Sequence, residues 1–468
     1  MSLLYSLQKV AALSAASGVF LGGGMAAYVA SRLWEGSMKD ALVDGEGRSY
    51  PNLVAVDSVL RAVGHTPVVR LKSLSELTGC DVYAKLEGMN PTGSMADRTA
   101  SIVMDHVVKA ELHPGSTTSL VTATESKDLA RSLGAMANAC GRTLSVHMPL
   151  HMFDSGPDDR HGDVLGALGV GLDRVQATAP SLSEKKLLAD PTARIDTHAQ
   201  VMNDCLRHAE QSQVVGKSQR RLFLRHQRLE WARAEGAAKV ADEARGQLRA
   251  LGVRRLWAVA APSSGALGAP EAARSLSQKN VGALGEKLSP SLVDVCLAHA
   301  ALPRGRRLSF ADAAAVGACG DEIDRQIKGL PGPQETDEHD VGVTPAEAVR
   351  MASYLALREG ILVGPAGALA ACAGLRAAAI AKRRKGAEHA LAESQPGSSV
   401  WEAEGWVADE KPVVLIIVPD GGRRHLVHGL HDAAWCTKAL GVDLDAMRKD
   451  IQQGQTTLGH LTADTKHS

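Results

Sequence analysis

The stretch VVLIIV at residues 413–418 decides the fold class of this chain. All six residues are apolar, so a strand that they form has two apolar faces. Such a strand belongs in the interior of a parallel sheet, where helices cover both sides. The stretch therefore predicts an α/β fold with mainly parallel sheets.

Apolar runs and amphipathic stretches alternate on the N-terminal side of this strand, as in βαβ units. The pattern predicts strands at residues 67–71, 82–86, 119–123, 144–147, 256–260 and 361–363. It predicts helices at residues 98–111, 127–140, 198–211, 229–250, 345–358, 367–384 and 423–439. The helix at 345 has the clearest start, because Thr344, Pro345 and Glu347 have the spacing of a capping box. Two stretches, 176–228 and 276–340, are less regular.

Composition excludes several classes of protein. The 468 residues are 45% hydrophobic and carry 52 basic and 52 acidic side chains, which argues against a disordered chain and against nucleic acid as a partner. The seven cysteines include no CxxC pair, so we expect neither a zinc ribbon nor a disulfide framework. The 17 histidines include no HExxH pair, and we predict no metal site.

An uncharged segment of 22 residues lies between Lys9 and Arg32 near the N-terminus. Its length suits a helix that crosses a bilayer core of about 30 Å, so we predict a single transmembrane anchor at residues 10–34 in contact with membrane lipid. Gly18 and Gly22 have the spacing with which membrane helices pack closely, although glycine is common in such segments. Residues 35–54 then form a linker, and we expect the protein in a mitochondrial membrane.

Four motifs occur in a fixed order through the remaining chain: VGHTPVVRL at 63–71, AKLEGMNPTGSMADR at 84–98, EGIL at 359–362 and VPDGGRR at 418–424. Together they resemble the cysteine synthase and cystathionine β-synthase family, the fold type II pyridoxal-phosphate (PLP) enzymes. The resemblance covers about residues 55–440. It implies a smaller nested domain at about 95–195 and a larger domain from 55–94 and 250–440, with PLP in the cleft between them. Residues 441–468 are expected to be a polar tail.

The resemblance also shows which cofactor contacts have changed. The family's lysine, whose amine links to PLP, corresponds to Ala96, and a methyl group cannot form that link. Lys85 lies eleven residues upstream on a predicted strand, and its use would require a rebuilt cleft. The serine that faces the pyridine nitrogen in the family corresponds to Ala366.

Two turns of the family's cleft are altered as well. The glycine-rich phosphate loop corresponds to Pro262-Ser263-Ser264-Gly265-Ala266, where Pro262 has no N–H and one glycine remains. The turn that holds the substrate carboxylate corresponds to Glu125-Ser126-Lys127-Asp128, where Glu125 and Asp128 would repel an anion. These positions, with Ala96 and Ala366, form a degenerate cofactor site, and we expect no bound cofactor.

Three functions remain open. The first is a membrane-anchored pseudoenzyme that acts as a structural or accessory subunit of a membrane complex, or as a homodimer. Its partner contacts are expected within 176–228 or 276–340, above all at the basic run 217–228. The second is a cysteine synthase that makes cysteine from an activated serine and a sulfur donor. The third is a small-molecule sensor that uses Lys127 and Ser263.

Overall fold

The computed structural model describes residues 56–111, 119–149, 161–175, 202–212, 221–263, 267–278, 293–301, 338–394, 410–426 and 429–454. All of these except Val56 and Asp57 belong to one compact unit, Ser58–Ser468. The predicted anchor at 10–34 and the linker at 35–54 lie outside the described residues. Within the described part, no helix is both long enough and apolar enough to span a membrane.

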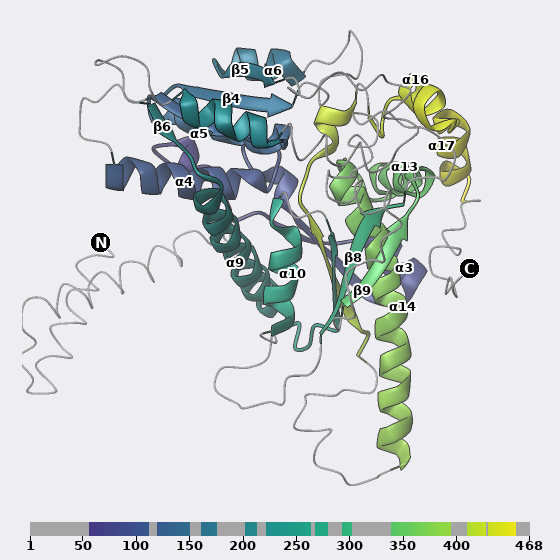
Figure 1. The fold of residues 1–468 in the computed structure, drawn as a ribbon. Coiled ribbons are helices and arrows are strands. Elements are labelled where there is room, and N and C mark those ends of the chain that lie inside the picture. Colours follow the sequence, from purple (N-terminus) through teal and green to yellow (C-terminus); the bar gives the residue numbers. More distant parts are fainter. Residues whose placement is uncertain are drawn as a thin grey trace, which may run out of the picture. The chain divides into compact units, whose positions relative to one another are not determined.

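The described residues of this unit form two sheets, drawn in Figure 1. The larger has the strand order β1-β2-β10-β7-β8-β9, and only β1 runs antiparallel to its neighbour. Its strands are β1 (Val68–Arg70), β2 (Asp81–Leu86), β7 (Ala258–Pro262), β8 (Asp294–Ala300), β9 (Glu338–Val343) and β10 (Val413–Val418). The smaller is wholly parallel in the order β5-β4-β3-β6. Its strands are β3 (Ser119–Ala123), β4 (Leu144–Pro149), β5 (Gly171–Val175) and β6 (Arg221–Phe223).

The strand β10 lies inside the larger sheet with all six residues buried, as its two apolar faces predict. Val413, Leu415 and Ile417 face one apolar cluster, whereas Val414, Ile416 and Val418 face another. The first cluster includes α9 (His226–Ala250) and α10 (Ala269–Gln278); the second includes α13 (Pro345–Tyr354) and α14 (Pro365–Ser394). Figure 1 shows these helices on the two sides of the strands, so the α/β fold with mainly parallel sheets is confirmed.

Helices also cover both faces of the smaller sheet. α4 (Ala96–Glu111) and α5 (Lys127–Ala139) pack with Leu120, Leu144 and Val146 in the first cluster. On the opposite face, Val121 and Val175 pack with Cys205 and Ala209 of a helix at residues 202–211. α6 (His161–Ala167) and the short helices α3 (Lys72–Thr78), α16 (Ala433–Trp435) and α17 (Leu444–Gln452) complete the regular helices of the described residues.

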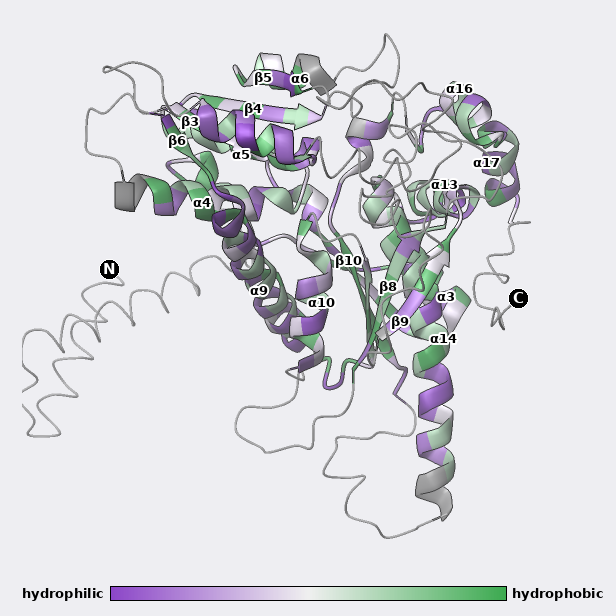
Figure 2. Ribbon diagram, in the orientation of Figure 1, coloured by the Kyte–Doolittle hydropathy of each residue, from purple (hydrophilic) through white to green (hydrophobic). Residues whose placement is uncertain are grey.

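Local sequence signals explain several helix boundaries. Thr344 accepts a hydrogen bond from the Glu347 N–H while Glu347 accepts one from the Thr344 N–H, which is the predicted capping box. In the EGIL motif, Glu359 accepts from the N–H groups of Lys72 and Leu74 and so caps α3. Figure 2 shows α14 mainly green beside the sheet and more purple farther along the helix. Lys382 and Arg383 of this helix are exposed.

The structure differs from the sequence-based elements in several places. The helix expected at 423–439 is instead a 3-10 turn at Gly422–His425 and, after non-helical residues, the short α16 that continues as a π-helical turn at Cys436–Leu440. The stretch 176–228, expected to be irregular, contains β6. Residues 361–363 form no strand, because only Val363 makes a β-bridge, to Gly421. The stretch 276–340, expected to be irregular, contains β8 and part of β9. Beyond Gly441, where we expected a polar tail, α17 buries Leu444, Met447 and Ile451.

Candidate functional site

The candidate site lies at the carboxyl ends of strands, where open α/β sheets usually bind ligands. Ala96, the first residue of α4, is buried, and its N–H donates to Ser94 Oγ at 3.2 Å. The segment before it is fixed to the end of β10, since Met95 N donates to Pro419 O at 2.7 Å and Ser94 bridges to Asp420. Position 96 therefore has the rigid support that a reactive side chain needs, but it carries a methyl group.

Asp420 connects this segment to the second changed position. Its Oδ2 accepts from the N–H of Ala366 at 3.3 Å, and its Oδ1 accepts from the N–H of Gly367 at 2.7 Å. The carboxylate is buried and stabilises the N-terminus of α14. Through Asp420, the structure brings Ala96 and Ala366 into the same neighbourhood, as the family resemblance implies.

The turn that by resemblance corresponds to the family's carboxylate turn begins α5. Ser126 is the N-cap, its Oγ accepts from the Leu129 N–H at 3.2 Å, and Asp128 forms an ion pair with Arg131 at 3.3 Å. The same helix is linked to the Ala96 segment, because Ser132 Oγ lies 3.1 Å from Thr92 Oγ1. Glu125, Ser126 and Asp128 thus lie on a turn whose helix packs against the start of α4.

The loop at residues 262–266, which by resemblance corresponds to the family's phosphate loop, is only partly described. Pro262 ends β7, and Ser263 N donates to Ala298 O at 2.6 Å. Ser264, Gly265 and Ala266 lie outside the described residues. The helix that follows, α10, has Glu271 in its first turn, and Glu271 pairs with Arg233 at 3.2 Å. A carboxylate at this helix start disfavours an anion there, although Arg233 offsets part of its charge.

Lys85 is the fully buried lysine of β2, and its amine is held by three acceptors. Nζ donates to Thr66 O at 2.6 Å, to Gln247 Oε1 at 2.9 Å and to Glu243 Oε2 at 3.0 Å. Burial lowers the pKa of Lys85, and the charge of Glu243 opposes that shift. Because an ammonium has three N–H groups, these acceptors use its whole hydrogen-bonding capacity.

Arg98 shares the same carboxylate. Its guanidinium donates to Glu243 at 2.8 and 2.7 Å and to Glu87 at 2.6 and 2.8 Å. Burial would lower the pKa of Arg98, but the hydrogen bonds to Glu243 and Glu87 raise it above its ordinary value. Lys85, Glu87, Arg98 and Glu243 therefore form a buried charge network that joins β2, α4 and α9.

Sequence comparison identifies the family. Residues 59–389 match the family described as pyridoxal-phosphate dependent enzymes. The chain belongs to this family. It is 39% identical over 114 residues to cysteine synthase of Dictyostelium discoideum, a match that covers 24% of this chain and 28% of that protein. It is 39% identical over 89 residues to cysteine synthase 1 of Neurospora crassa, covering 19% of this chain and 23% of that protein. The chain thus spans about a quarter of the length of these curated relatives.

Solved structures support the same fold. The cysteine synthase of Entamoeba histolytica has a TM-score of 0.52 and 15% identity, with 86% of this chain and 98% of that chain covered. A hydrogen sulfide-producing enzyme of Fusobacterium nucleatum has a TM-score of 0.50 and 16% identity, with 80% and 100% covered. Our assignment to the fold type II PLP enzymes is confirmed.

Membership of this family corrects our expectation of no cofactor, because the family is PLP-dependent and PLP is therefore the cofactor that membership indicates. The described residues do not fit its usual lysine link. Position 96 is a buried methyl group, and the Lys85 amine is fully hydrogen-bonded on the side of β2 that faces α9.

The sequence analysis missed two features of the site. Asp420 was noted only as part of a motif, and its role as an acceptor for Ala366 and Gly367 depends on the contact between β10 and α14. Glu243 lies in a helix with no motif, and only the fold brings it to Lys85 and Arg98. In the sequence of α9, apolar and small residues recur every three to four positions, which indicates that one face of the helix is buried. This pattern does not indicate that Glu243 contacts Lys85 and Arg98.

Proposed function

We propose that this chain is a pseudoenzyme of the PLP-dependent family, which keeps the fold as a structural or accessory subunit and does not perform lysine-dependent turnover. One observation carries the proposal: the buried, rigidly supported first residue of α4 is Ala96. A methyl group can neither link to a carbonyl nor move a proton. The proposal concerns turnover, and it is compatible with PLP bound without a lysine link.

Residues of the four family-like motifs support this reading, because several of them stabilise the fold. The charge network around Arg98, the cap on α3 by Glu359 and the cap on α14 by Asp420 involve motif residues that stabilise the scaffold. Residues that would serve chemistry have changed, whereas those that serve folding remain. A fold retained without its reactive group is consistent with a role in assembly, because function depends on sites and not on the fold.

The experiment is an absorbance scan combined with an assay of turnover. Purified full-length protein is incubated with PLP, scanned in the visible range, and then given an activated serine and sulfide. We expect no lysine-linked absorbance band and no cysteine above the rate in buffer. Turnover at an ordinary enzymic rate, on the order of 1 s⁻¹ or more, would favour the alternative suggested by the named relatives, an active cysteine synthase.

The membrane location is part of the same proposal and rests on the sequence alone. Residues 10–31 are uncharged and long enough to cross a bilayer, and we propose a single-pass anchor at residues 10–34 in a mitochondrial membrane. Alkaline carbonate extraction should leave the full-length protein in the pellet and release a chain that begins at Ala55. Full-length protein in the supernatant would remove the anchor from the proposal.

The accessory role predicts a partner other than lipid. Crosslinking mass spectrometry on native membranes should give links from residues 176–228 or 276–340 to a different protein. Links confined to a second copy of this chain, together with a dimer on native gels, would contradict the accessory role.

A further inference from the structure

Three side chains that can bind metal meet on one face of the smaller sheet, away from the candidate site. They are His147 on β4, Asp173 on β5 and His208 on the helix at 202–211. The face is the one that packs with Val121, Val175 and Cys205. The opposite face, with Leu144 and Val146, packs against α4 and α5. The cluster is therefore separate from Ala96 and its surroundings.

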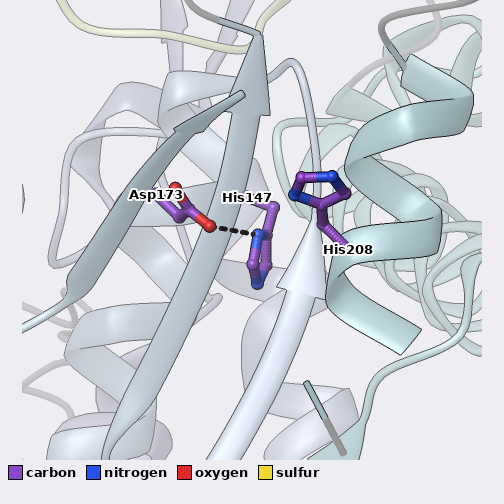
Figure 3. Close-up of side chains that lie close together, drawn as sticks. All are labelled: His147, Asp173 and His208. Carbon is purple, nitrogen blue, oxygen red and sulfur yellow. Dashed lines mark ion pairs between the residues drawn. The ribbon is translucent and has the colours of Figure 1, made fainter. Parts of the chain in front are cut away.

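The register of the sheet creates the first half of the cluster. His147 pairs directly with Asp173 across the parallel strands β4 and β5, so their side chains project from the same face. His147 Nδ1 lies 3.0 Å from Asp173 Oδ2, drawn as a dashed line in Figure 3. His147 is 7% exposed, whereas Asp173 is open to solvent.

His208 supplies the second imidazole from the helix that covers this face. Figure 3 shows the His147 ring between Asp173 and His208. The ring centroids of the two histidines are 6.4 Å apart, and one ligand atom from each of the three residues lies within 4.8 Å of the others. His208 is exposed, whereas the His147 ring that it faces is buried.

The buried imidazole provides a second observation. His147 Nδ1 is buried and makes no well-aligned hydrogen bond among the described residues, and its polar contact is the ion pair with Asp173 Oδ2 at 3.0 Å. Buried polar atoms normally have a polar partner, and an ion bound between the two side chains would be shared by both.

We propose that His147, Asp173 and His208 bind one divalent transition metal ion of the zinc class. Two imidazoles and one carboxylate are the donors that such ions accept, at about 2.0–2.2 Å. A tetrahedral ion with these bond lengths separates its ligand atoms by about 3.3 Å, so the three ligand atoms, which now lie within 4.8 Å of one another, would move closer together on binding. Three protein ligands leave one position for water or a fourth ligand.

The ion would also have a structural consequence. It would connect β4 and β5 to the helix at 202–211, which otherwise contacts the sheet through the small cluster of Val121, Ala123, Val175, Cys205 and Ala209. Binding to the folded state only would stabilise this face.

The test uses full-length, untagged protein freed of metal with a chelator and titrated with Zn²⁺ in a calorimeter. The variants are His208→Ala and Asp173→Asn, and the matched control is His299→Ala. His299 contacts Asp340 at 2.7 Å but belongs to no three-ligand cluster among the described residues. Circular dichroism establishes that each variant is folded.

We expect wild type and the His299→Ala control to bind Zn²⁺ with equal affinity, and both cluster variants to bind it at least ~10-fold more weakly. Titration with Co²⁺ should give visible absorption bands of a nitrogen-ligated, four-coordinate ion in the wild type, and excess Mg²⁺ should not remove them. The proposal is overturned if both cluster variants bind Zn²⁺ as tightly as the control, if the wild type binds none, or if Mg²⁺ displaces the ion.

Discussion

The amine of Lys85 lies 3.0 Å from Oε2 of Glu243, in an ion pair that joins β2 to α9. Lys85 is fully buried and Glu243 is nearly so, since their side chains are 0% and 19% exposed. The pair therefore has a structural role, because Lys85 would be left buried without Glu243, and Glu243 without Lys85 would keep only Arg98 as a cation. This assignment accounts for Lys85 without any role in chemistry at position 96.

Replacing Lys85 should destabilise the fold. Lys85→Met leaves Glu243 with one fewer cation, and we expect the free energy of unfolding to fall by about 3 kcal/mol in urea titrations. The control is Arg70→Ala in the exposed ion pair between Arg70 and Asp81, where a loss below about 1 kcal/mol is expected. Equal losses in the two variants would contradict the structural assignment.

The same pair predicts how stability depends on pH. Burial would raise the pKa of Glu243, but the hydrogen bonds and charge of Arg98, aided by Lys85, lower it to about 2. Its ordinary value is 4.5, so the ionised carboxylate stabilises the folded state above pH 4.5, and that contribution is lost as pH falls toward 2. We expect up to about 3 kcal/mol to be lost across this window.

Glu243→Gln tests whether Glu243 causes the loss of stability between pH 4.5 and 2. The variant should be less stable than wild type at neutral pH, and its unfolding free energy should change less between pH 4.5 and 2, as measured by urea titration at each pH. If the unfolding free energy of the variant falls as steeply as that of wild type between pH 4.5 and 2, other carboxylates cause the loss.

The sequence predicted the elements whose signals are local. The apolar faces of β10 and the capping box at Thr344 each depend on a few adjacent residues, and both were correct. β8 and β9 were missed because His299, Glu338 and Asp340 interrupt the apolar pattern expected of strands. These residues form strands because β8 and β9 pair with each other in the sheet, and this long-range pairing cannot be read from their composition.

The candidate site also combines residues with a local sequence signal and residues that only the packing of the fold brings together. Position 96 could be identified from its motif, whereas Glu243 reaches Lys85 only after α9 packs on β2. The cluster of His147, Asp173 and His208 has no sequence motif, because the register of two strands and the packing of a separate helix create it. Spacing along the chain carries no information of this kind.

Two glycines in α14 offer a matched pair of substitutions. A Cβ on Gly374 would overlap the side chain of Ile416 on β10, whereas a Cβ on Gly386 would meet nothing within 4 Å. Gly374→Ala should therefore lower stability by about 1–3 kcal/mol through overpacking, and Gly386→Ala should raise it by about 0.5–1 kcal/mol through helix propensity. Thermal unfolding of both variants measures the contrast. Stabilisation by both would mean that α14 does not pack tightly on β10.

Restoring the family lysine should not restore activity. Ala96→Lys supplies an amine at the start of α4, but Glu125 and Asp128 would still repel a substrate carboxylate, and Glu271 would still lie at the start of α10. Because misplacement by about 1 Å can lower a rate by about 100-fold, we expect cysteine formation to remain at least that far below an ordinary synthase rate. The experiment compares Ala96→Lys with a multiple variant that also rebuilds residues 125–130, 262–266 and 366 to the family pattern. Both variants are assayed with PLP, an activated serine and sulfide. If the single change alone gives an ordinary rate, the remaining cleft is intact, and the chain is one substitution away from an enzyme.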